Sequence, residues 1–307
     1  MKLSVKIGDM TLKNPVMVAS GTFGYGQEAS DFLDLSCLGG IITKSVTLKP
    51  RAGNPPPRIC ELPGGMLNSI GLANVGLERF IEEKLPFLRG LNTQLIVNIA
   101  GGVADEFGEV LERLDDESGI AAYELNFSCP NVKEGGLEFS QNANVLSRVT
   151  RKLRKITKRP LIVKLTPNVS GIGSIARAAE ESGADAISAI NTVLGFAVDI
   201  EQKRPRIYRG LAGYSGPAIK PIALAKVYEA AQNVNIPIIG IGGIKSGEDA
   251  LEFIITGATA VQIGAANFID PRTSEFVLQG ILEYGARHGV DSIASLIGSL
   301  KPWQESN

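Results

Sequence analysis

Polar or small residues stand at the ends of eight short apolar runs in this sequence. Such a run is typical of a buried β-strand, and a polar residue directly after it lies where the functional groups of parallel-strand proteins gather. Each residue alone is explained by helix capping, packing or a tight turn, but their joint occurrence favours one shared site. The residues at the eight ends are Ser20 and Gly21; Lys44 and Ser45; Asn98; Asn126 with Ser128 and Cys129; Lys164; Asn191 and Thr192; Gly242 and Gly243; Gly264 and Ala265.

The last two run ends carry a phosphate-binding pattern. Gly242 and Gly243 follow the seventh run, and Gly264 with Ala265 follows the eighth. Glycine lets backbone N–H groups approach an anion closely, and the helix N-termini that follow add positive potential. The pattern predicts a bound phosphate, although tight turns alone would also explain the glycines.

The remaining run ends suggest what carries this phosphate. Two lysines and three asparagines spread around one site suit a large heteroaromatic ring with a carbonyl edge better than a sugar phosphate. We therefore expect FMN, with Lys164 placing positive charge near the N1/O2 edge of the ring and favouring the anionic reduced flavin. The alternative for this lysine is a Schiff-base nucleophile in an aldolase without flavin.

Cys129 is the strongest candidate for removing a proton above a flavin. It lies in LNFSCPNVKEGG, just past a run end, where a thiol is a base, a nucleophile or an inert side chain. The single histidine, His288, lies far along the chain in a polar stretch, so the usual general base is missing. A free thiol has a pKa of about 8.5, so the rate should rise with pH.

Helical patterns separate the apolar runs and decide the architecture. Eight strands alternating with amphipathic helices predict an α/β fold, a (β/α)₈ TIM barrel; a doubly wound open sheet is the alternative. The expected strands are 15–19, 40–43, 95–99, 122–126, 161–165, 186–190, 237–241 and 260–263, and the expected helices 77–89, 104–116, 142–156, 174–182, 221–232, 246–256 and 273–284.

Three further segments complete this architecture. A hairpin over residues 3–12 would cap the bottom of the barrel. Segments 45–76 and 192–219 are much longer than the usual connection after a strand, so we expect two insertions over the C-terminal face, where barrel enzymes keep their chemistry. The whole chain, 1–307, is expected to form one FMN-binding domain.

Composition narrows the function classes. With 307 residues, 44% hydrophobic and 21% charged, the chain is an ordinary globular protein. Its net charge of -1 offers no footprint for nucleic acid or an anionic membrane, and no apolar run has signal-peptide or membrane-spanning length, which predicts a cytoplasmic protein. Cys37, Cys60 and Cys129 are too far apart for a CxxC metal or iron–sulfur site.

The sequence resembles the catalytic subunit of class 1 dihydroorotate dehydrogenases over nearly its whole length, and subclass 1B most of all in its length and NSIGL loop. In having a cysteine in the SCPN loop, the sequence resembles class 1 enzymes, because the membrane-associated class 2 enzymes have serine at this position. The motifs that carry the resemblance are SGTFG at 20–24, NPPPR at 54–58, GGMLNSIGL at 64–72, NFSCPN at 126–131, VKLTPN at 163–168, INT at 190–192, YSGPAIKP at 214–221 and GIGGI at 240–244.

The resemblance implies oxidation of dihydroorotate to orotate in pyrimidine biosynthesis. Cys129 would take the proton from C5 while a hydride leaves C6 for flavin N5, and Lys44 would serve both catalysis and binding. Substrate would be held by Lys44, Asn68, Ser69, Ile70, Gly71, Leu72, Asn126, Asn191 and Thr192. FMN would be held by Ser20, Lys44, Ser45, Asn98, Asn126, Lys164, Ile190, Gly216, Gly242, Gly243, Gly264 and Ala265.

The resemblance also implies partners. Subclass 1B enzymes are homodimers that join a second chain, carrying FAD and a [2Fe-2S] cluster, in a heterotetramer that passes electrons to NAD. This sequence departs from the family pattern in three places: Ser45 replaces a common alanine, Tyr214 a common leucine and Ala265 the usual threonine. The last change removes one hydroxyl contact near the expected phosphate.

Four other functions remain open at this stage. One is an FMN enzyme acting on dihydrouracil or dihydrothymine. These substrates have no carboxylate, so such an enzyme would need no cation in the position of Lys44. The second, a tRNA dihydrouridine synthase, is disfavoured by the neutral charge. The third is a barrel without redox chemistry, and the fourth a flavin-binding module with degenerate chemistry.

Overall fold

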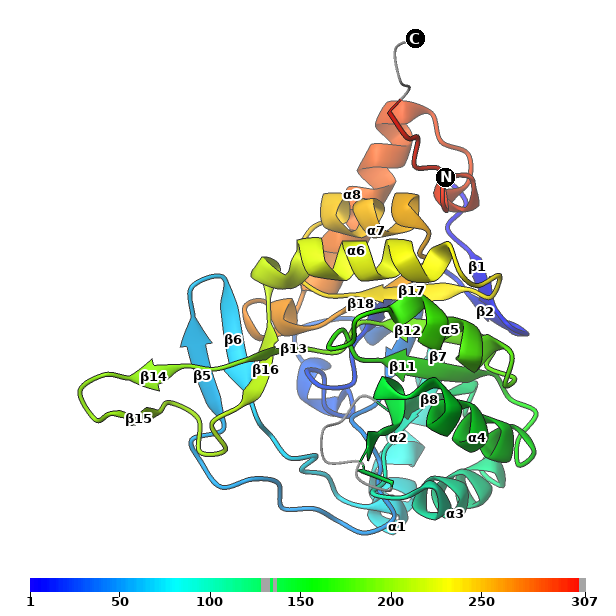
Figure 1. The fold of residues 1–307 in the computed structure, drawn as a ribbon. Coiled ribbons are helices and arrows are strands. Elements are labelled where there is room, and N and C mark those ends of the chain that lie inside the picture. Colours follow the sequence, from blue (N-terminus) through cyan, green and yellow to red (C-terminus); the bar gives the residue numbers. More distant parts are fainter. Residues whose placement is uncertain (128–132, 135–136, 304–307) are drawn as a thin grey trace.

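The computed structural model describes residues 1–127, 133–134 and 137–303. Eight parallel strands close into a barrel (Figure 1), which confirms the predicted (β/α)₈ fold. Each strand lies within one residue of its expected bounds at either end. In order around the ring the strands are β11 (Leu161–Leu165), β12 (Ala186–Ala189), β17 (Ile238–Ile241), β18 (Ala260–Ile263), β3 (Val16–Val18), β4 (Gly40–Ile42), β7 (Gln94–Ile99) and β8 (Ala122–Asn126).

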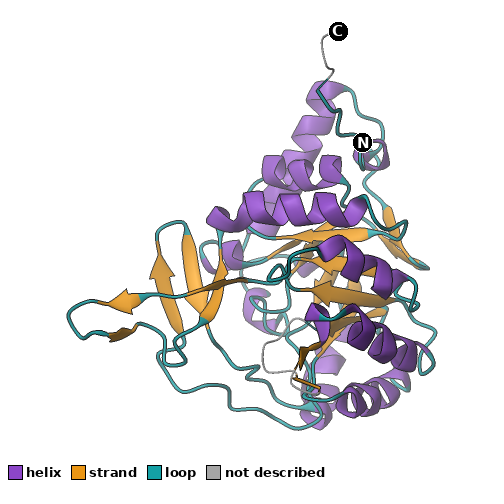
Figure 2. Cartoon of the chain, viewed as in Figure 1, coloured by secondary structure: helices purple, strands orange, loops and turns teal. Residues whose placement is uncertain are grey.

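Helices cover the outside of this barrel (Figure 2), which explains why its strands are buried on both faces. In helix α3 (Ala104–Asp115), for example, the side chains at one face are fully buried and recur at helical spacing: Phe107, Val110, Leu111 and Leu114. The helices are α1 (Leu77–Arg79), continued by the π-helical turn η3 (Phe80–Lys84) and α2 (Leu85–Arg89), then α3 (Ala104–Asp115), α4 (Ala143–Arg154), α5 (Ile172–Glu180), α6 (Lys220–Ala231), α7 (Gly247–Thr256) and α8 (Thr273–His288).

The connection between β3 and β4 departs from the strand–helix repeat. It contains two short 3-10 turns, η1 (Gln27–Ala29) and η2 (Leu35–Cys37), in place of an α-helix. Gly24 and Gly26 have φ values of 56° and 83°, a left-handed backbone that ends regular helix. Asp34 then caps η2 by accepting a hydrogen bond from the Ser36 N–H.

The two long insertions pair with each other, which the sequence did not reveal. They form a four-stranded antiparallel sheet over one end of the barrel (Figure 1), in the order β13, β16, β6, β5. Its own small core consists of Cys60, Leu67, Ile207 and Ala212. The strands are β5 (Ile59–Leu62), β6 (Gly65–Asn68), β13 (Val193–Gly195) and β16 (Ala212–Ser215), and the hairpin β14 (Val198–Asp199) with β15 (Arg204–Pro205) projects from this sheet.

The opposite end of the barrel is closed by the predicted hairpin, β1 (Val5–Ile7) with β2 (Met10–Leu12). Its turn residue Gly8 lies against Pro160 and Asp185, which directly precede β11 and β12. Smaller elements are β9 (Lys133–Glu134), β10 (Leu137–Glu138), and the 3-10 turns η4 (Phe139–Gln141), η5 (Pro217–Ile219), η6 (Ala265–Phe268) and η7 (Ile293–Leu296). Within the described ranges, no helix combines the length and apolarity needed to cross a membrane.

Candidate active site

Side chains from three neighbouring strands meet inside the C-terminal end of the barrel. Ser45, just after β4, donates a hydrogen bond of 2.5 Å to Asn98 Oδ1 on β7, and Asn126 Nδ2 on β8 donates one of 3.3 Å to Ser45 Oγ. All three residues are buried. The structure therefore brings together three of the predicted cofactor-binding residues.

Glu124 completes this group and was missed by the sequence argument, which found no acidic residue at the strand ends. Its Oε1 accepts a hydrogen bond of 2.7 Å from Asn98 Nδ2, and its Oε2 accepts one of 2.7 Å from Gln262 Nε2. The Glu124 side chain is fully buried. Strand alternation would have found it, because Glu124 lies two residues before Asn126 and shares its face of β8.

Lys164 lies in the same interior, beside Asn126 in the register between β11 and β8. Its Nζ is 3.9 Å from Glu124 Oε1, and its side chain is 7% exposed. That distance is too long for a hydrogen bond, and within the described part of the chain no other group accepts one from this ammonium. Buried donors of this kind are normally paired, so Lys164 has capacity for a ligand.

Two further polar atoms in this interior lack partners among the described residues. Ser188 is paired with Lys164 in the register between β12 and β11, and its hydroxyl has no hydrogen bond. Gln262 Oε1 is likewise unpaired. A ligand with both carbonyl and N–H groups would suit this surplus, which matches the donor and acceptor edges of an isoalloxazine ring.

Lys44 supplies a second cation at the end of β4. It is partly buried. Burial is the main cause that lowers the pKa of its ammonium; nearby Arg58 lowers it further, while Glu28 acts in the opposite direction. A cation partly removed from water gains from an anionic partner, so Lys44 is suited to a substrate carboxylate.

Most of the predicted glycines have a packing reason to be glycine, and Gly242 also lies beside Ile190. Gly242 has φ 135°, and a Cβ there would lie 2.6 Å from Ala223 Cβ; Gly243 has φ 73°, with Lys220 Cβ at 2.8 Å. A Cβ at Gly216 would lie 2.6 Å from Gly65 Cα. Tight packing therefore accounts for these three residues whether or not a phosphate binds.

Gly264 differs from the other glycines. Its φ is -107°, and the nearest atom to an added Cβ is Ala19 Cβ at 3.8 Å. Packing therefore does not demand glycine at this point. The open space lies at the end of β18, next to buried Ser20 at the end of β3 and to Ala265, the first residue of η6. The space beside Gly264 is therefore the position that best fits the predicted phosphate.

The loop formed by residues 68–72 is braced by Asn54, a residue of the NPPPR motif to which the sequence argument gave no role. Asn54 Nδ2 donates to Ser69 O at 3.0 Å and to Ser69 Oγ at 2.9 Å, and the Asn54 N–H donates to Ile70 O at 3.0 Å. Gly71 and Leu72 both have positive φ, 76° and 58°. The predicted substrate loop is thus a defined turn.

Gly213 brings the substrate loop to the residues after β12. Asn68 Nδ2 donates a hydrogen bond of 3.3 Å to Gly213 O, and Thr192 Oγ1 is packed so closely that a Cβ at Gly213 would lie 2.1 Å from it. Asn191 donates its backbone N–H to Leu165 O, one residue after Lys164. Predicted substrate residues from both insertions therefore converge above the barrel.

The cysteines and the histidine are placed as follows. Cys129, the predicted base, lies outside the described residues. Cys60 is buried in the added sheet, and Cys37 is partly buried near η2; both are free thiols. His288 ends α8 and stacks on Tyr284 with ring centroids 4.2 Å apart. Since α8 returns to the end of the barrel that holds the N-terminal hairpin, His288 is far from this site.

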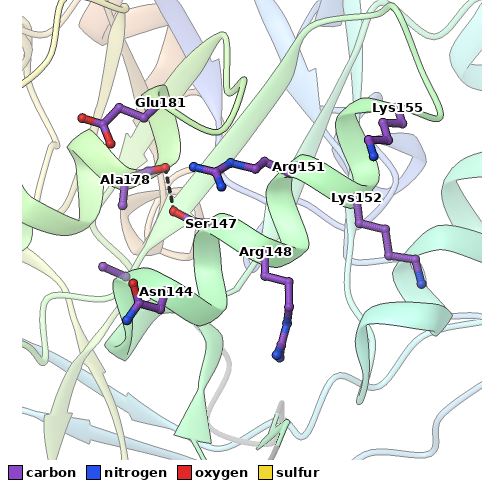
Figure 3. Close-up of a pocket in the computed structure, with 9 residues that line it drawn as sticks. Asn144, Ser147, Arg148, Arg151, Lys152, Lys155, Ala178 and Glu181 are labelled. Atoms are coloured by element: carbon purple, nitrogen blue, oxygen red, sulfur yellow. Dashed lines mark hydrogen bonds between the residues drawn. The ribbon is translucent and has the colours of Figure 1, made fainter.

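A groove of about 630 Å³ lies elsewhere, on the outer surface between α4 and α5 (Figure 3). Its walls include Arg148, Arg151 and Lys152 of α4, Lys155 just after α4, and Glu181 just after α5. Lys152 forms an ion pair with Asp105. None of the predicted site residues lines this groove.

A family model described as "Dihydroorotate dehydrogenase" matches residues 2–284 of the sequence. The chain belongs to the dihydroorotate dehydrogenase family. It is 51% identical over 299 residues to the "Dihydroorotate dehydrogenase B (NAD(+)), catalytic subunit" of Citrifermentans bemidjiense, covering 97% of this chain and 98% of that protein. The protein of the same name from Thermoanaerobacter sp. (strain X514) is 52% identical over 301 residues, 98% of this chain and 99% of its own length.

A solved dihydroorotate dehydrogenase has the same fold. The crystal structure of the Eimeria tenella enzyme in complex with ferulenol aligns with a TM-score of 0.81 at 24% identity, over 97% of this chain and 88% of that one. These comparisons confirm the resemblance to class 1B and the enzyme class predicted from the motifs, a dihydroorotate dehydrogenase.

Proposed function

We propose that residues 1–307 form one FMN-binding domain that oxidises dihydroorotate to orotate. The observation that carries this proposal is the buried ammonium of Lys164, which has unused donors beside the hydrogen-bonded group of Ser45, Asn98 and Asn126. Buried ammonium donors are normally satisfied by hydrogen bonds, so these unused donors support a ligand at this site.

The polar interior fits FMN. Lys164, Asn98, Asn126 and Ser45 would contact the ring, with Lys44 at its edge, while Ser20, Gly264 and Ala265 would surround the phosphate. Ile190 and the closely packed Gly216, Gly242 and Gly243 would complete the wall between them. When bound, FMN supplies the acceptor for the two electrons that leave the substrate as a hydride.

The groups above the barrel would bind the substrate. Lys44 would pair with the carboxylate, and the turn of residues 68–72 would offer backbone N–H groups. Asn68, Asn126, Asn191 and Thr192 supply amide and hydroxyl groups, which match the alternating donors and acceptors of a cyclic imide.

Cys129 would act as the general base. It would take the proton from C5, which the neighbouring carbonyl acidifies, while the hydride leaves C6; together these losses convert the single bond to a double bond. The two cysteines that the structure describes are poorly suited to this role, because Cys37 and Cys60 lie away from the barrel interior and Cys60 is buried in another core.

Electron transfer onward would need a second chain. Relatives are named catalytic subunits of an NAD(+) enzyme, which supports a partner subunit. That partner would carry FAD and a [2Fe-2S] cluster and would join a homodimer of this chain in a cytoplasmic heterotetramer. This chain has three cysteines, which are far apart in the sequence, whereas such a cluster takes four cysteine ligands, so we place the cluster on the partner.

Anaerobic titration tests this function. Purified protein should be yellow, and dihydroorotate should bleach its flavin in the absence of oxygen. Dihydrouracil, which lacks the carboxylate, should bleach it far more slowly because it cannot use Lys44. Preference for dihydrouracil, or protein that binds no flavin, would contradict the proposal. Adding NAD with and without the partner subunit then identifies the route of the electrons.

A further inference from the structure

We propose that Glu124 is a positioning residue that orients the amides of the flavin site and offsets the charge of Lys164. The inference rests on the proposed function and deepens it, because it assigns a role to a buried carboxylate that does not itself contact substrate. Three observations carry it: the bonds that cross the barrel, the orientation of Asn98, and the distance to Lys164.

The first observation is that the carboxylate joins opposite sides of the barrel. Glu124 is on β8 and Gln262 on β18, which are separated by three strands in either direction around the ring. The hydrogen bond of 2.7 Å between them therefore crosses the interior. A carboxylate held from both sides has a fixed position, and it fixes the floor on which a ligand would rest.

The second observation concerns amide orientation. An ionised carboxylate can accept hydrogen bonds but cannot donate them. Asn98 must therefore turn its Nδ2 toward Glu124, at a distance of 2.7 Å. The Asn98 Oδ1 then faces Ser45, whose hydroxyl donates to it and consequently accepts from Asn126. One buried charge thus determines which atoms of three neighbouring side chains act as donors.

The third observation concerns charge. Glu124 is fully buried, and in the described part of the chain Lys164 is its ion-pair partner, at 3.9 Å. A buried carboxylate needs a cation and hydrogen bonds to remain ionised. The separation is short enough for strong attraction but too long for a hydrogen bond. Lys164 is therefore held in place while its donors stay available for the ligand.

This arrangement limits how strongly Lys164 favours the reduced flavin. A lone ammonium would stabilise the anionic reduced ring, whereas an ammonium beside a carboxylate acts as a weaker dipole. Glu124→Gln removes the negative charge and keeps the shape. It also keeps its hydrogen bonds, since Gln262 Oε1 is unpaired and can turn toward the new amide.

The test is the affinity for oxidised and for reduced FMN, measured separately on protein stripped of flavin and reconstituted. Glu124→Gln should increase the preference for reduced over oxidised FMN about tenfold, equivalent to a more positive midpoint potential. An unchanged preference would overturn the inference. Gln262→Met is the matched comparison, because it loses the bond across the barrel but keeps the carboxylate; it should weaken the binding of oxidised and of reduced FMN by similar factors.

A second comparison covers the case in which Glu124→Gln alone does not fold. Lys164→Met removes the cation, and Lys164→Met/Glu124→Gln removes both charges, which leaves no unpaired ion in the barrel. The double variant should prefer reduced FMN more than Lys164→Met does, and equal preferences would overturn the inference. A change in Gln262→Met as large as that in Glu124→Gln would also overturn it, because loosened packing would then be the cause.

These outcomes are distinct from a failure of the proposed function. If the native chain binds no FMN, or binds FMN that dihydroorotate does not bleach, the proposed function is wrong. If the native chain passes both tests and the charge variants do not differ, only the role of Glu124 is wrong.

Discussion

Ser45 and Asn98 are joined by a hydrogen bond of 2.5 Å from the Ser45 hydroxyl to the Asn98 side-chain oxygen, inside the end of the barrel. Backbone pairing between β4 and β7 already places these strands side by side. The side-chain bond adds a fixed donor–acceptor pattern that extends to Asn126 and Glu124. The chemistry of the site therefore depends on a continuous group of buried polar side chains.

Ser45→Ala should destabilise the chain, because it leaves Asn98 Oδ1 buried without its donor. An unsatisfied buried acceptor lowers the free energy of unfolding by about 1–3 kcal/mol. Denaturant unfolding of the flavin-free protein measures this change. Ser30→Ala is a suitable control, since the Ser30 hydroxyl donates to Gln27 O at an exposed turn; its effect should stay within about 0.5 kcal/mol. Equal effects would contradict a special role for Ser45.

Gly264→Ala should lower the affinity for FMN, whereas Gly243→Ala should lower the stability of the fold. At Gly264 an added Cβ meets only Ala19 Cβ at 3.8 Å, so stability should be kept while affinity for FMN falls about tenfold as the space for the phosphate is filled. At Gly243, φ of 73° and Lys220 Cβ at 2.8 Å predict a loss of about 1–3 kcal/mol of stability. Native FMN affinity in Gly264→Ala would place the phosphate elsewhere.

Lys44 should make substrate binding sensitive to alkaline pH. Burial lowers the pKa of its ammonium, so the positive charge is lost at lower pH than for an exposed lysine, whose pKa is about 10.4. The KM for dihydroorotate should therefore rise on the alkaline side before other lysines titrate. Lys44→Met should raise the KM for dihydroorotate about 10- to 100-fold and abolish this rise, whereas the KM for the uncharged dihydrouracil should change much less. An unchanged KM would assign the carboxylate to another cation.

Cys129→Ala should slow reduction of the flavin by dihydroorotate by about 10² to 10⁴, the usual contribution of a general base, with FMN still bound. The native rate should rise with pH as the thiolate forms, near a pKa of about 8.5. Stopped-flow bleaching measures both. Cys37→Ala is the control, because burial raises the pKa of Cys37 to about 11 and keeps it protonated over this range. A native rate in Cys129→Ala would exclude Cys129 as the base.

The barrel could be predicted from the sequence because its strands are buried on both faces and appear as short apolar runs. The polar residues that end these runs, such as Asn98, Asn126 and Lys164, stand out against them. Their placement in one interior follows from strand direction alone. Glu124 was not predicted, because it lies within a strand rather than at the end of one, where polar residues were sought.

No helix was predicted between the first two strands, and this connection contains only 3-10 turns. The pairing of the two insertions, in contrast, could not be predicted from local patterns. The pairing of β6 with β16 joins segments far apart in the chain, as in the register of Leu67 with Tyr214. Such pairing depends on the completed barrel, which brings both insertions to the same end.

The shared sheet over the barrel has a consequence for protein engineering. Each insertion supplies two of its four strands, so replacing one insertion with that of a relative would leave β6 or β16 facing a mismatched neighbour with unpaired N–H and C=O groups. The two segments must therefore be exchanged together. Attempts to transplant substrate preference should treat 45–76 and 192–219 as a single module.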